Sequence, residues 1–483
     1  MPDLLTPFDA SLVAALFHLV LAPVAAIHAL IYKRDSRAAF GWITLCVLLP
    51  IAGPVLYALL GVNRIQRRAR RLALPRLTVG YERGRGFNTP RDLPVDSNLD
   101  EHHRQLAGIG DLLSEHELVD GNRVIPLING EKAYPDMLEG IAGATSSVFL
   151  SSYILDSDRT GREFVAALGA AVARGVQVRV LIDGIGCFYS FPPVTRLLRR
   201  AGVPAALFLP PRLLPPRLSI NLRNHHKLLI IDGKTAYTGG MNIGDRHRLD
   251  RQPARKAVAD IHFRLTGPIA GQLQAEFLRD WEFSTGEKLD PVTPATQEPT
   301  GPAWCRTLTD GPDDNLDQIV LALNAIIGQA RRSILIMTPY FLPPRELIGA
   351  LQAAALRGVE VLLVLPEKSN LPYVHWATRN MLWELLYLNI RVVYQPPPFN
   401  HGKLLAVDDC YAQIGSSNWD PRSLRLNFEL QVEIFNRQFA RECAGWIRQA
   451  AERGREVTLQ EVDSRGLPAR LRDSFCWLFS PYL

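Results

Sequence analysis

After residue 118, hydrophobic and polar positions alternate between strand-like and helix-like patterns, and the same order of patterns occurs twice. Residues 146–155 are a short apolar run typical of a strand, residues 161–175 repeat apolar positions at helical spacing, and residues 176–183 are strand-like again. The same order returns about 180 residues later, at 332–342, 345–358 and 359–366. This duplication predicts two α/β halves with right-handed crossovers and largely parallel strands.

The boundaries of the halves follow from composition. The stretch "DPVTPATQEPTGP" at 290–302 has the Pro, Thr and Gly content of a linker. We therefore expect a first half over 119–292 and a second over 300–483. A polar, proline-dotted connector over 76–118 precedes them, after an N-terminal segment over 1–75.

The N-terminal segment is dominated by two uncharged runs. Residues 10–32 and 38–63 contain no Lys, Arg, Asp or Glu, and they are separated only by "KRDSR". About 20 apolar residues span a bilayer as a helix, so the pattern predicts a transmembrane helical hairpin. A cleaved signal peptide fits poorly, because the leader "MPDLLTPFD" lacks a basic start and a second run follows at once. Pro50 and Pro54 leave open a kinked or re-entrant second segment.

Positive charge is concentrated after the second run. Three basic residues lie between the runs, and six arginines follow them: Arg64, Arg67, Arg68, Arg70, Arg71 and Arg76. This bias predicts a multi-pass membrane protein with its bulk in the cytoplasm. The cluster would lie against an anionic membrane.

Composition narrows the partners and the compartment. The 483 residues carry 54 Lys and Arg against 48 Asp and Glu, a net charge of +6 that favours anionic partners, either lipid or nucleic acid. The six cysteines are scattered without a CxxC pair, which argues against a zinc module or a secreted disulfide scaffold. A reducing compartment fits best.

One polar motif occurs in both halves. "NHHKLLIID" at 224–232 returns as "NHGKLLAVD" at 400–408, 176 residues later. In an extended strand His225 and Lys227 point one way and His226 the other. Because Gly402 replaces His226 in the second copy, we treat His401 and Lys403 as the functional equivalents of the first pair.

The motif has an aspartate at its end and a matched tail. Asp232 precedes Gly233, which predicts a turn where the carboxylate braces the motif, and Asp408 is its counterpart. The matched tail residues are Gly239, Gly240 and Asn242 in the first copy and Gly415, Ser416 and Asn418 in the second. Two copies with matched tails make a chance match very improbable.

Two histidines and two lysines suit chemistry on a phosphodiester. One imidazole would attack phosphorus while the other protonates the departing alkoxide and then deprotonates the incoming hydroxyl. Lys227, Lys403, Asn242 and Asn418 would hold the non-bridging oxygens, a task that magnesium performs in many phosphoryl-transfer enzymes. No metal is expected, since lysine is a poor ligand and no compact carboxylate or thiolate set accompanies the histidines.

A simpler interpretation competes with this chemistry. Each motif would then be a core strand with a satisfied histidine, although burying half of a lysine side chain is costly without an anion beside it.

A nucleophilic histidine also needs a hydrogen-bond acceptor on its other ring nitrogen. Asp260 lies 35 residues after His225, and Glu429 lies 28 after His401, so each is the candidate in its own half. Both carboxylates are also compatible with solvated strand ends.

The quoted motifs, together with "RNHHKLLIIDGKTAYTGGMNIGD" (223–245), "IGSSNWDPRSLRLNFEL" (414–430) and the terminal "LFSPYL", resemble the phospholipase D superfamily. Within it the chain is similar, over essentially its whole length, to the bacterial cardiolipin synthases. The resemblance implies two halves related by a pseudo-twofold axis, one shared active site and no cofactor. The catalytic set would be His225, Lys227, Asp232, His401, Lys403 and Asp408, with Asn242, Asn418, Ser416, Asp260 and Glu429 in support.

The family reaction joins two phosphatidylglycerols into cardiolipin and releases glycerol. The resemblance implies a phosphatidyl-histidine intermediate on His225, with His401 as acid and base, in the bacterial cell membrane. Gly240 departs from the commoner serine, so one phosphate contact would be supplied differently in the first half.

Three functions remain compatible with these residues: a cardiolipin-forming phosphatidyltransferase, a hydrolase of the phospholipase D or nuclease type, and a catalytically silent membrane scaffold. The intact signature disfavours the scaffold. The juxtamembrane position of the charge favours a lipid over nucleic acid, which is not an expected partner.

Overall fold

The computed structural model describes residues 7–33, 36–49, 51–61, 101–211, 222–292, 299–311 and 317–480. They belong to two compact units, Met1–Leu74 and Pro75–Leu483.

The N-terminal unit is helical. Its elements are α1 (Pro7–Tyr32), α2 (Ser36–Leu48), α3 (Ala52–Leu56) and the π-helical turn η1 (Tyr57–Gly61). Small side chains let the helices approach closely, since Ala29 and Cys46 are fully buried and His28 Nδ1 lies 2.8 Å from the Tyr57 hydroxyl. The second uncharged run is thus divided into separate elements, as its prolines allowed.

Within the part of the chain that the structure describes, no helix combines the length and apolar character needed to cross a membrane. The six arginines expected beside the membrane lie outside the described residues.

The larger unit begins with α5 (Glu101–Leu113), which falls in the expected connector. This helix packs on α10 of the second half, and its Leu106 and Ala107 belong to the core of that half. Buried Arg306 anchors it, because the guanidinium lies 2.6 Å from Asp111 of α5 and 2.7 Å from Glu433. The end of the connector is therefore part of the folded unit.

Both halves repeat the predicted strand, helix and strand, which the structure confirms. The first half contains β1 (Val119–Ile128), α6 (Asn129–Gly143), β2 (Ser147–Ser152), α7 (Arg159–Ala173), β3 (Gln177–Asp183), α8 (Val194–Arg200), β4 (Ala205–Phe208), β5 (Leu228–Ile231), β6 (Thr235–Gly239), β7 (Val258–Ala259), β8 (Ile261–Thr266) and α9 (Ile269–Thr285). The second contains β9 (Ala303–Asp310), α10 (Gln318–Gln329), β10 (Ser333–Met337), α11 (Arg345–Leu356), β11 (Glu360–Pro366), α12 (Pro372–Met381), α13 (Trp383–Leu386), β12 (Arg391–Gln395), β13 (Phe399–Asn400), β14 (Leu404–Val407), β15 (Tyr411–Gly415), α14 (Pro421–Arg425), β16 (Glu429–Phe435), α15 (Arg437–Glu452), β17 (Arg455–Glu456), α16 (Leu459–Asp463) and α17 (Leu467–Leu478).

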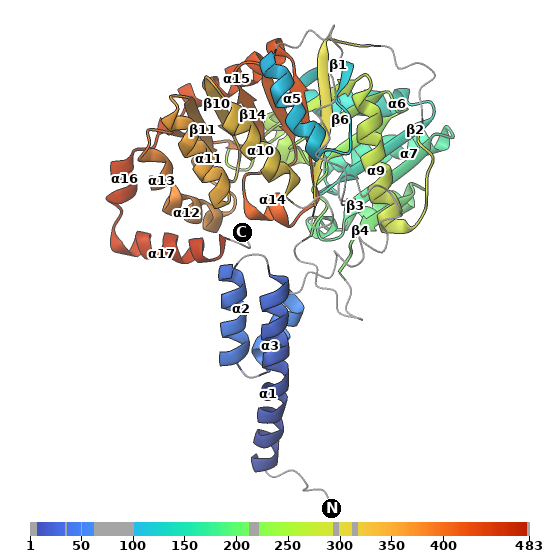
Figure 1. Ribbon diagram of the computed structural model, residues 1–483. Coiled ribbons are helices and arrows are strands. Elements are labelled where there is room, and N and C mark those ends of the chain that lie inside the picture. The colour runs from blue at the N-terminus through green and yellow to red at the C-terminus, as the bar shows by residue number, and fades with distance from the viewer. Residues whose placement is uncertain are drawn as a thin grey trace, which may run out of the picture. The chain divides into compact units, whose positions relative to one another are not determined.

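The strands form one continuous sheet that runs through both halves (Figure 1), in the order β17-β12-β11-β10-β14-β15-β16-β9-β1-β8-β6-β5-β2-β3-β4. Pairing is parallel within β2-β3-β4 and β10-β11-β12 but antiparallel among the remaining strands, apart from the separate β7-β13 pair. The expectation of largely parallel strands is therefore wrong. The motif strand β5 turns directly into β6 through Asp232 and Gly233, and such a short connection can only join antiparallel strands.

Apolar layers hold the helices on the sheet. One cluster joins α6 and α7 to β2 and β3, and another joins α10 and α11 to β10 and β11. Helix α9 crosses β2, where the Phe149 and Phe277 rings stack 5.1 Å apart. Full burial of one such side chain stabilises the fold by roughly 1.5–3 kcal/mol. The rigid layers fix the strand ends that carry the polar motif.

Candidate active site

The two halves exchange backbone hydrogen bonds where the histidine motifs lie. The His225 N–H donates to the Phe428 carbonyl of the second half at 2.9 Å, and the His401 N–H donates to the Ala259 carbonyl of the first half at 2.7 Å. Strand β13, just before His401, pairs in parallel with β7 of the first half. Each histidine is therefore held by the other half, which brings both motifs into one site.

An asparagine before each histidine shapes the local turn. Asn224 Oδ1 accepts the His226 N–H, and Asn400 Oδ1 accepts the Gly402 N–H, both at 2.8 Å. Sequence reasoning missed this role, although the same residue precedes both histidines. These paired turns orient the two motifs alike.

The carboxylate partners of the histidines are crossed between halves. His225 Nδ1 lies 3.0 and 3.1 Å from the two oxygens of Glu429, and His401 Nδ1 lies 2.9 Å from Asp260 Oδ2. The expectation that each carboxylate serves the histidine of its own half is wrong, because the backbone of each histidine bonds to the residue that precedes the carboxylate of the other half, Phe428 before Glu429 and Ala259 before Asp260. Each carboxylate fixes its ring by Nδ1, which leaves Nε2 for chemistry.

Burial and the neighbouring charges together set the ionisation of these four groups. It lowers the pKa of both His225 and His401 to about 4, further depressed by the neighbouring lysines and opposed by the carboxylates. Burial alone would raise the pKa of Asp260, but His401 and Lys403 hold it at about 2. Likewise the pKa of buried Glu429 is lowered by His225 and Lys227. Near neutral pH the rings are neutral and their carboxylates are ionised.

The two lysines make the site receptive to an anion. Burial lowers the pKa of Lys227 to about 7 and that of Lys403 to about 8. Lys227 Nζ donates to the His225 carbonyl at 2.9 Å, and Lys403 Nζ donates to the His401 carbonyl at 2.8 Å and lies 3.2 Å from His401 Nε2. Among the described residues neither lysine is ion-paired with a carboxylate. Bound phosphate would supply the missing negative charge.

Ser416 supports Glu429. Its hydroxyl donates to the carboxylate that holds His225. In the first half a Cβ on Gly240 would lie only 2.6 and 2.9 Å from the oxygens of Asp260. Glycine therefore lets Asp260 approach the backbone where the second half has a serine.

The two tail asparagines tie loops to the motif. Asn242 Oδ1 accepts the Ile154 N–H at 3.2 Å, and Asn418 Nδ2 donates to the Ser423 hydroxyl at 3.1 Å. Asn418 Oδ1 is buried and has no partner among the described residues. The expected contact of both side chains with substrate oxygens stays a prediction.

The two motif aspartates lie at the far ends of β5 and β14 from the histidines. Asp232 accepts the backbone N–H groups of Ser146 and Ser147 at 2.8 Å, and Asp408 accepts those of Arg332 and Ser333 at 2.7 and 2.9 Å. They join the start of β2 to β5 and of β10 to β14. The bracing role predicted for them matches this geometry.

Further side chains around the histidines escaped sequence reasoning. The Tyr153 ring lies 5.0 Å from His225, and the Tyr340 ring 6.3 Å from His401. Each follows the first parallel strand of its half, a repeated position that could have been noticed. The His247 ring lies 6.5 Å from His401, and burial lowers its pKa to about 3. The sequence repeat gave no indication of His247, because the repeated motifs do not include it.

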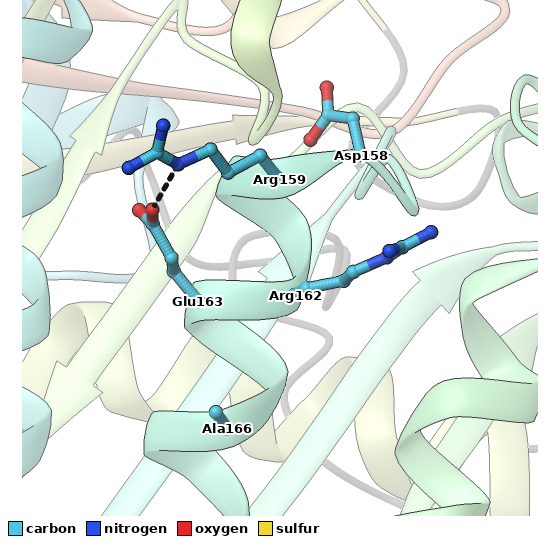
Figure 2. Close-up of a pocket in the computed structure, with 5 residues that line it drawn as sticks. All are labelled: Asp158, Arg159, Arg162, Glu163 and Ala166. Atoms are coloured by element: carbon cyan, nitrogen blue, oxygen red, sulfur yellow. Dashed lines mark hydrogen bonds and ion pairs between the residues drawn. The ribbon is translucent and has the colours of Figure 1, made fainter.

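A separate surface hollow of about 460 Å³ lies on α7 (Figure 2). Its lining residues are Asp158, Arg159, Arg162, Glu163 and Ala166. Arg159 and Glu163 pair across one turn of the exposed helix at 3.2 Å, and no motif residue lines the hollow. It is distinct from the histidine site.

Two copies of one α/β domain that place paired histidines and lysines in a single site define a phosphodiester-processing enzyme of the two-histidine class. Residues 137–281 and 323–451 match the family described as cardiolipin synthase, PLD-like domain, and residues 20–61 match the phospholipase D-nuclease N-terminal family. The chain belongs to the cardiolipin synthase family of the phospholipase D superfamily.

Similar proteins align over nearly the full length. The major cardiolipin synthase of Bacillus subtilis (strain 168) is 31% identical, covering 98% of this chain and 99% of that protein. Cardiolipin synthase A of Pseudomonas putida (strain GB-1) is 29% identical and covers 100% of both. The solved phosphatidylserine synthase of Haemophilus influenzae shares the fold at 15% identity, with a TM-score of 0.60 over 78% of this chain and 100% of that chain.

Proposed function

We propose that this enzyme makes cardiolipin by transferring the phosphatidyl group of one phosphatidylglycerol to a glycerol hydroxyl of another. Membership of the cardiolipin synthase family supports this reaction. The observation that carries the mechanism is the crossed arrangement, in which His225 is held by Glu429 and His401 by Asp260.

The first step forms a bond between phosphorus and nitrogen. Neutral His225, with Nδ1 held by Glu429, attacks phosphorus through Nε2 while the bond to the terminal glycerol breaks. His401 donates a proton to that departing oxygen, so free glycerol leaves. Lys227 and Lys403 neutralise the phosphate oxygens. The anionic phosphate in turn offsets the lysine charge that depresses the histidine pKa, which favours the protonated His401 that this step needs.

The second step reverses the roles. His401, now neutral, takes a proton from a glycerol hydroxyl of the second phosphatidylglycerol, whose oxygen attacks phosphorus. The bond to His225 breaks, and cardiolipin leaves. No metal or other cofactor takes part. Both histidine rings are only 11% exposed, which limits access of water to the intermediate and favours transfer over hydrolysis.

Membrane attachment belongs to the same proposal. The N-terminal helices expose large apolar side chains, among them Leu19 and Leu30 of α1 and Phe40 of α2 at about 70% exposure. Large exposed apolar side chains of this kind suit contact with lipid. We assign the enzyme to the bacterial cell membrane, with the histidine site on the cytoplasmic side.

Incubation of the detergent-solubilised enzyme with phosphatidylglycerol tests the reaction. Cardiolipin with one glycerol released per cardiolipin supports the proposal. Phosphatidic acid as the sole lipid product would identify a phospholipase D-type hydrolase, and absence of any turnover would contradict both.

Trapping with labelled lipid tests the two histidine roles. His401→Ala should accumulate an acid-labile phosphatidyl adduct, since the attack on phosphorus remains possible while its resolution is slowed. His225→Ala should accumulate none. The opposite pattern would exchange the roles of the two residues.

A further inference from the structure

The last described helix, α17, exposes an apolar stripe. Four large side chains on it are each more than 60% exposed: Leu467, Leu471, Phe475 and Leu478. At 100° per residue they fall within an arc of about 80° on one side of the helix. Arg470 and Arg472 lie on the two flanks of this stripe, which we call the α17 apolar face.

The opposite side of α17 is already packed. Asp473 is fully buried there and accepts hydrogen bonds from Arg379 of α12, at 2.7 Å, and from Arg465 and Arg472. The Arg472 guanidinium also lies 4.5 Å from the Trp376 ring of α12. Packing of α17 on α12 thus leaves the α17 apolar face outward.

The surroundings of the α17 apolar face are positively charged. Three arginines surround the single carboxylate of Asp473, and Arg470 adds a further exposed cation. An apolar helix face with flanking basic residues is the pattern of a helix that lies in the interface of an anionic bilayer. A symmetric pairing with a second copy would bring these like charges together, which is unfavourable.

Helix α12 connects α17 to a group of aromatic side chains beside His401, namely Tyr340, Tyr373 and Tyr189, which we call the active-site mouth. Tyr340, beside His401, bonds through its hydroxyl to Asn370 Oδ1 at 2.6 Å, just before α12 begins. Tyr189 of the first half and Tyr373 of α12 both lie near Tyr340. Phe191, in the same first-half loop as Tyr189, is 90% exposed. In Figure 1, α12 and α17 lie on the same lower edge of the unit as the ends of β3 and β4.

We propose that the α17 apolar face is a membrane-docking surface, separate from the N-terminal unit, that lies in an anionic phospholipid interface and holds the active-site mouth against it. This proposal rests on the proposed function, because it places a lipid-consuming site at the surface that contains its substrate.

A comparison of two substrate forms tests the surface. The full-length Leu471→Glu/Phe475→Glu variant should lose about tenfold or more of its turnover on phosphatidylglycerol vesicles. On monomeric short-chain phosphatidylglycerol its rate should stay within about twofold of the unchanged enzyme, because neither residue touches the histidine site. Leu356→Glu is the matched control. Leu356 is 74% exposed at the end of α11, at the opposite end of the parallel strands from α12, and its replacement should alter neither rate.

Equal loss on both substrates would reveal a purely structural role, and unchanged vesicle turnover would also overturn the proposal. A depth measurement needs no turnover, and it separates failure of docking from failure of the proposed reaction. A fluorophore on Leu471→Cys, in a Cys476→Ser background of the full chain in vesicles, should be quenched by brominated lipid, whereas one on Leu356→Cys should not. Absence of quenching at position 471, or its burial in a dimer detected by light scattering, would refute the surface.

Discussion

Replacing Glu429 by Gln tests the crossed support of His225. The carboxylate is fully buried, and its two oxygens lie 3.0 and 3.1 Å from His225 Nδ1. Gln keeps the shape but removes the charge that stabilises the imidazole as its Nε2 bonds to phosphorus. A hydrogen bond to a charged partner contributes roughly 1.5–3 kcal/mol, so the loss corresponds to roughly 10- to 150-fold in rate.

The assay is a rapid acid-free quench of enzyme mixed with labelled phosphatidylglycerol, which follows formation of the phosphatidyl-histidine adduct. Glu429→Gln should slow adduct formation by that factor. Asp260→Asn should act on the proton transfers of His401, and should therefore slow resolution of the adduct as well as its formation, in which glycerol leaves. Ser416→Ala, which removes only the hydroxyl that supports Glu429, should slow adduct formation by a few-fold at most.

Adduct formation by Glu429→Gln within twofold of the unchanged rate would contradict the support of His225 by Glu429. Slower attack in Asp260→Asn, with an unchanged rate in Glu429→Gln, would contradict it too, because His225 would then depend on the carboxylate of its own half. A thermal melt of each variant checks that the fold is retained.

Three further outcomes follow from the structure. Gly240→Ser should lower the initial rate of cardiolipin formation, since its Cβ would lie 2.6 Å from an oxygen of Asp260, whereas Gly143→Ser, with no atom within 4 Å of its Cβ position, should not. Asp232→Ala should destabilise the fold by about 2 kcal/mol through lost backbone hydrogen bonds at a partly exposed site, seen as a melting temperature several degrees lower; an unchanged melt would contradict the bracing role. The pKa of His225 and of His401 is about 4 in the folded protein, against an ordinary value near 6.5. As the pH drops from about 6.5 to 4, the unfolded chain therefore binds protons before the folded protein does, and the free energy of unfolding should fall. A melting temperature that stays constant over that range would contradict burial of the two rings in their neutral form.

The sequence predicted the parts of the site that depend on local repetition. The recurrence of histidine and lysine in both halves located the chemistry, and the turn at Asp232 followed from the glycine after it. The parallel β2-α7-β3 unit was equally readable, because two short strand-like apolar segments flank a segment with apolar residues at helical spacing.

The crossed pairing could not be read from the sequence. Asp260 and Glu429 lie at similar distances along the chain from the histidine of their own half, and the backbone bonds that hold each histidine on the other half leave no mark on local patterning. The sequence also could not distinguish support of Glu429 by Ser416 from phosphate binding by Ser416, because a serine hydroxyl can do either. The mixed sheet was missed because the prediction followed the helical crossovers, whereas short turns join β5 to β6 and β14 to β15 in antiparallel pairs.

A structure of the enzyme with bound vanadate tests the central claim most directly, since vanadate adopts the geometry of a phosphoryl group under attack. We predict a single vanadate bonded to Nε2 of His225, within hydrogen-bond distance of Nε2 of His401, and contacted by lysines from both halves. Two separate vanadates, or one bound by the residues of a single half, would contradict the shared site.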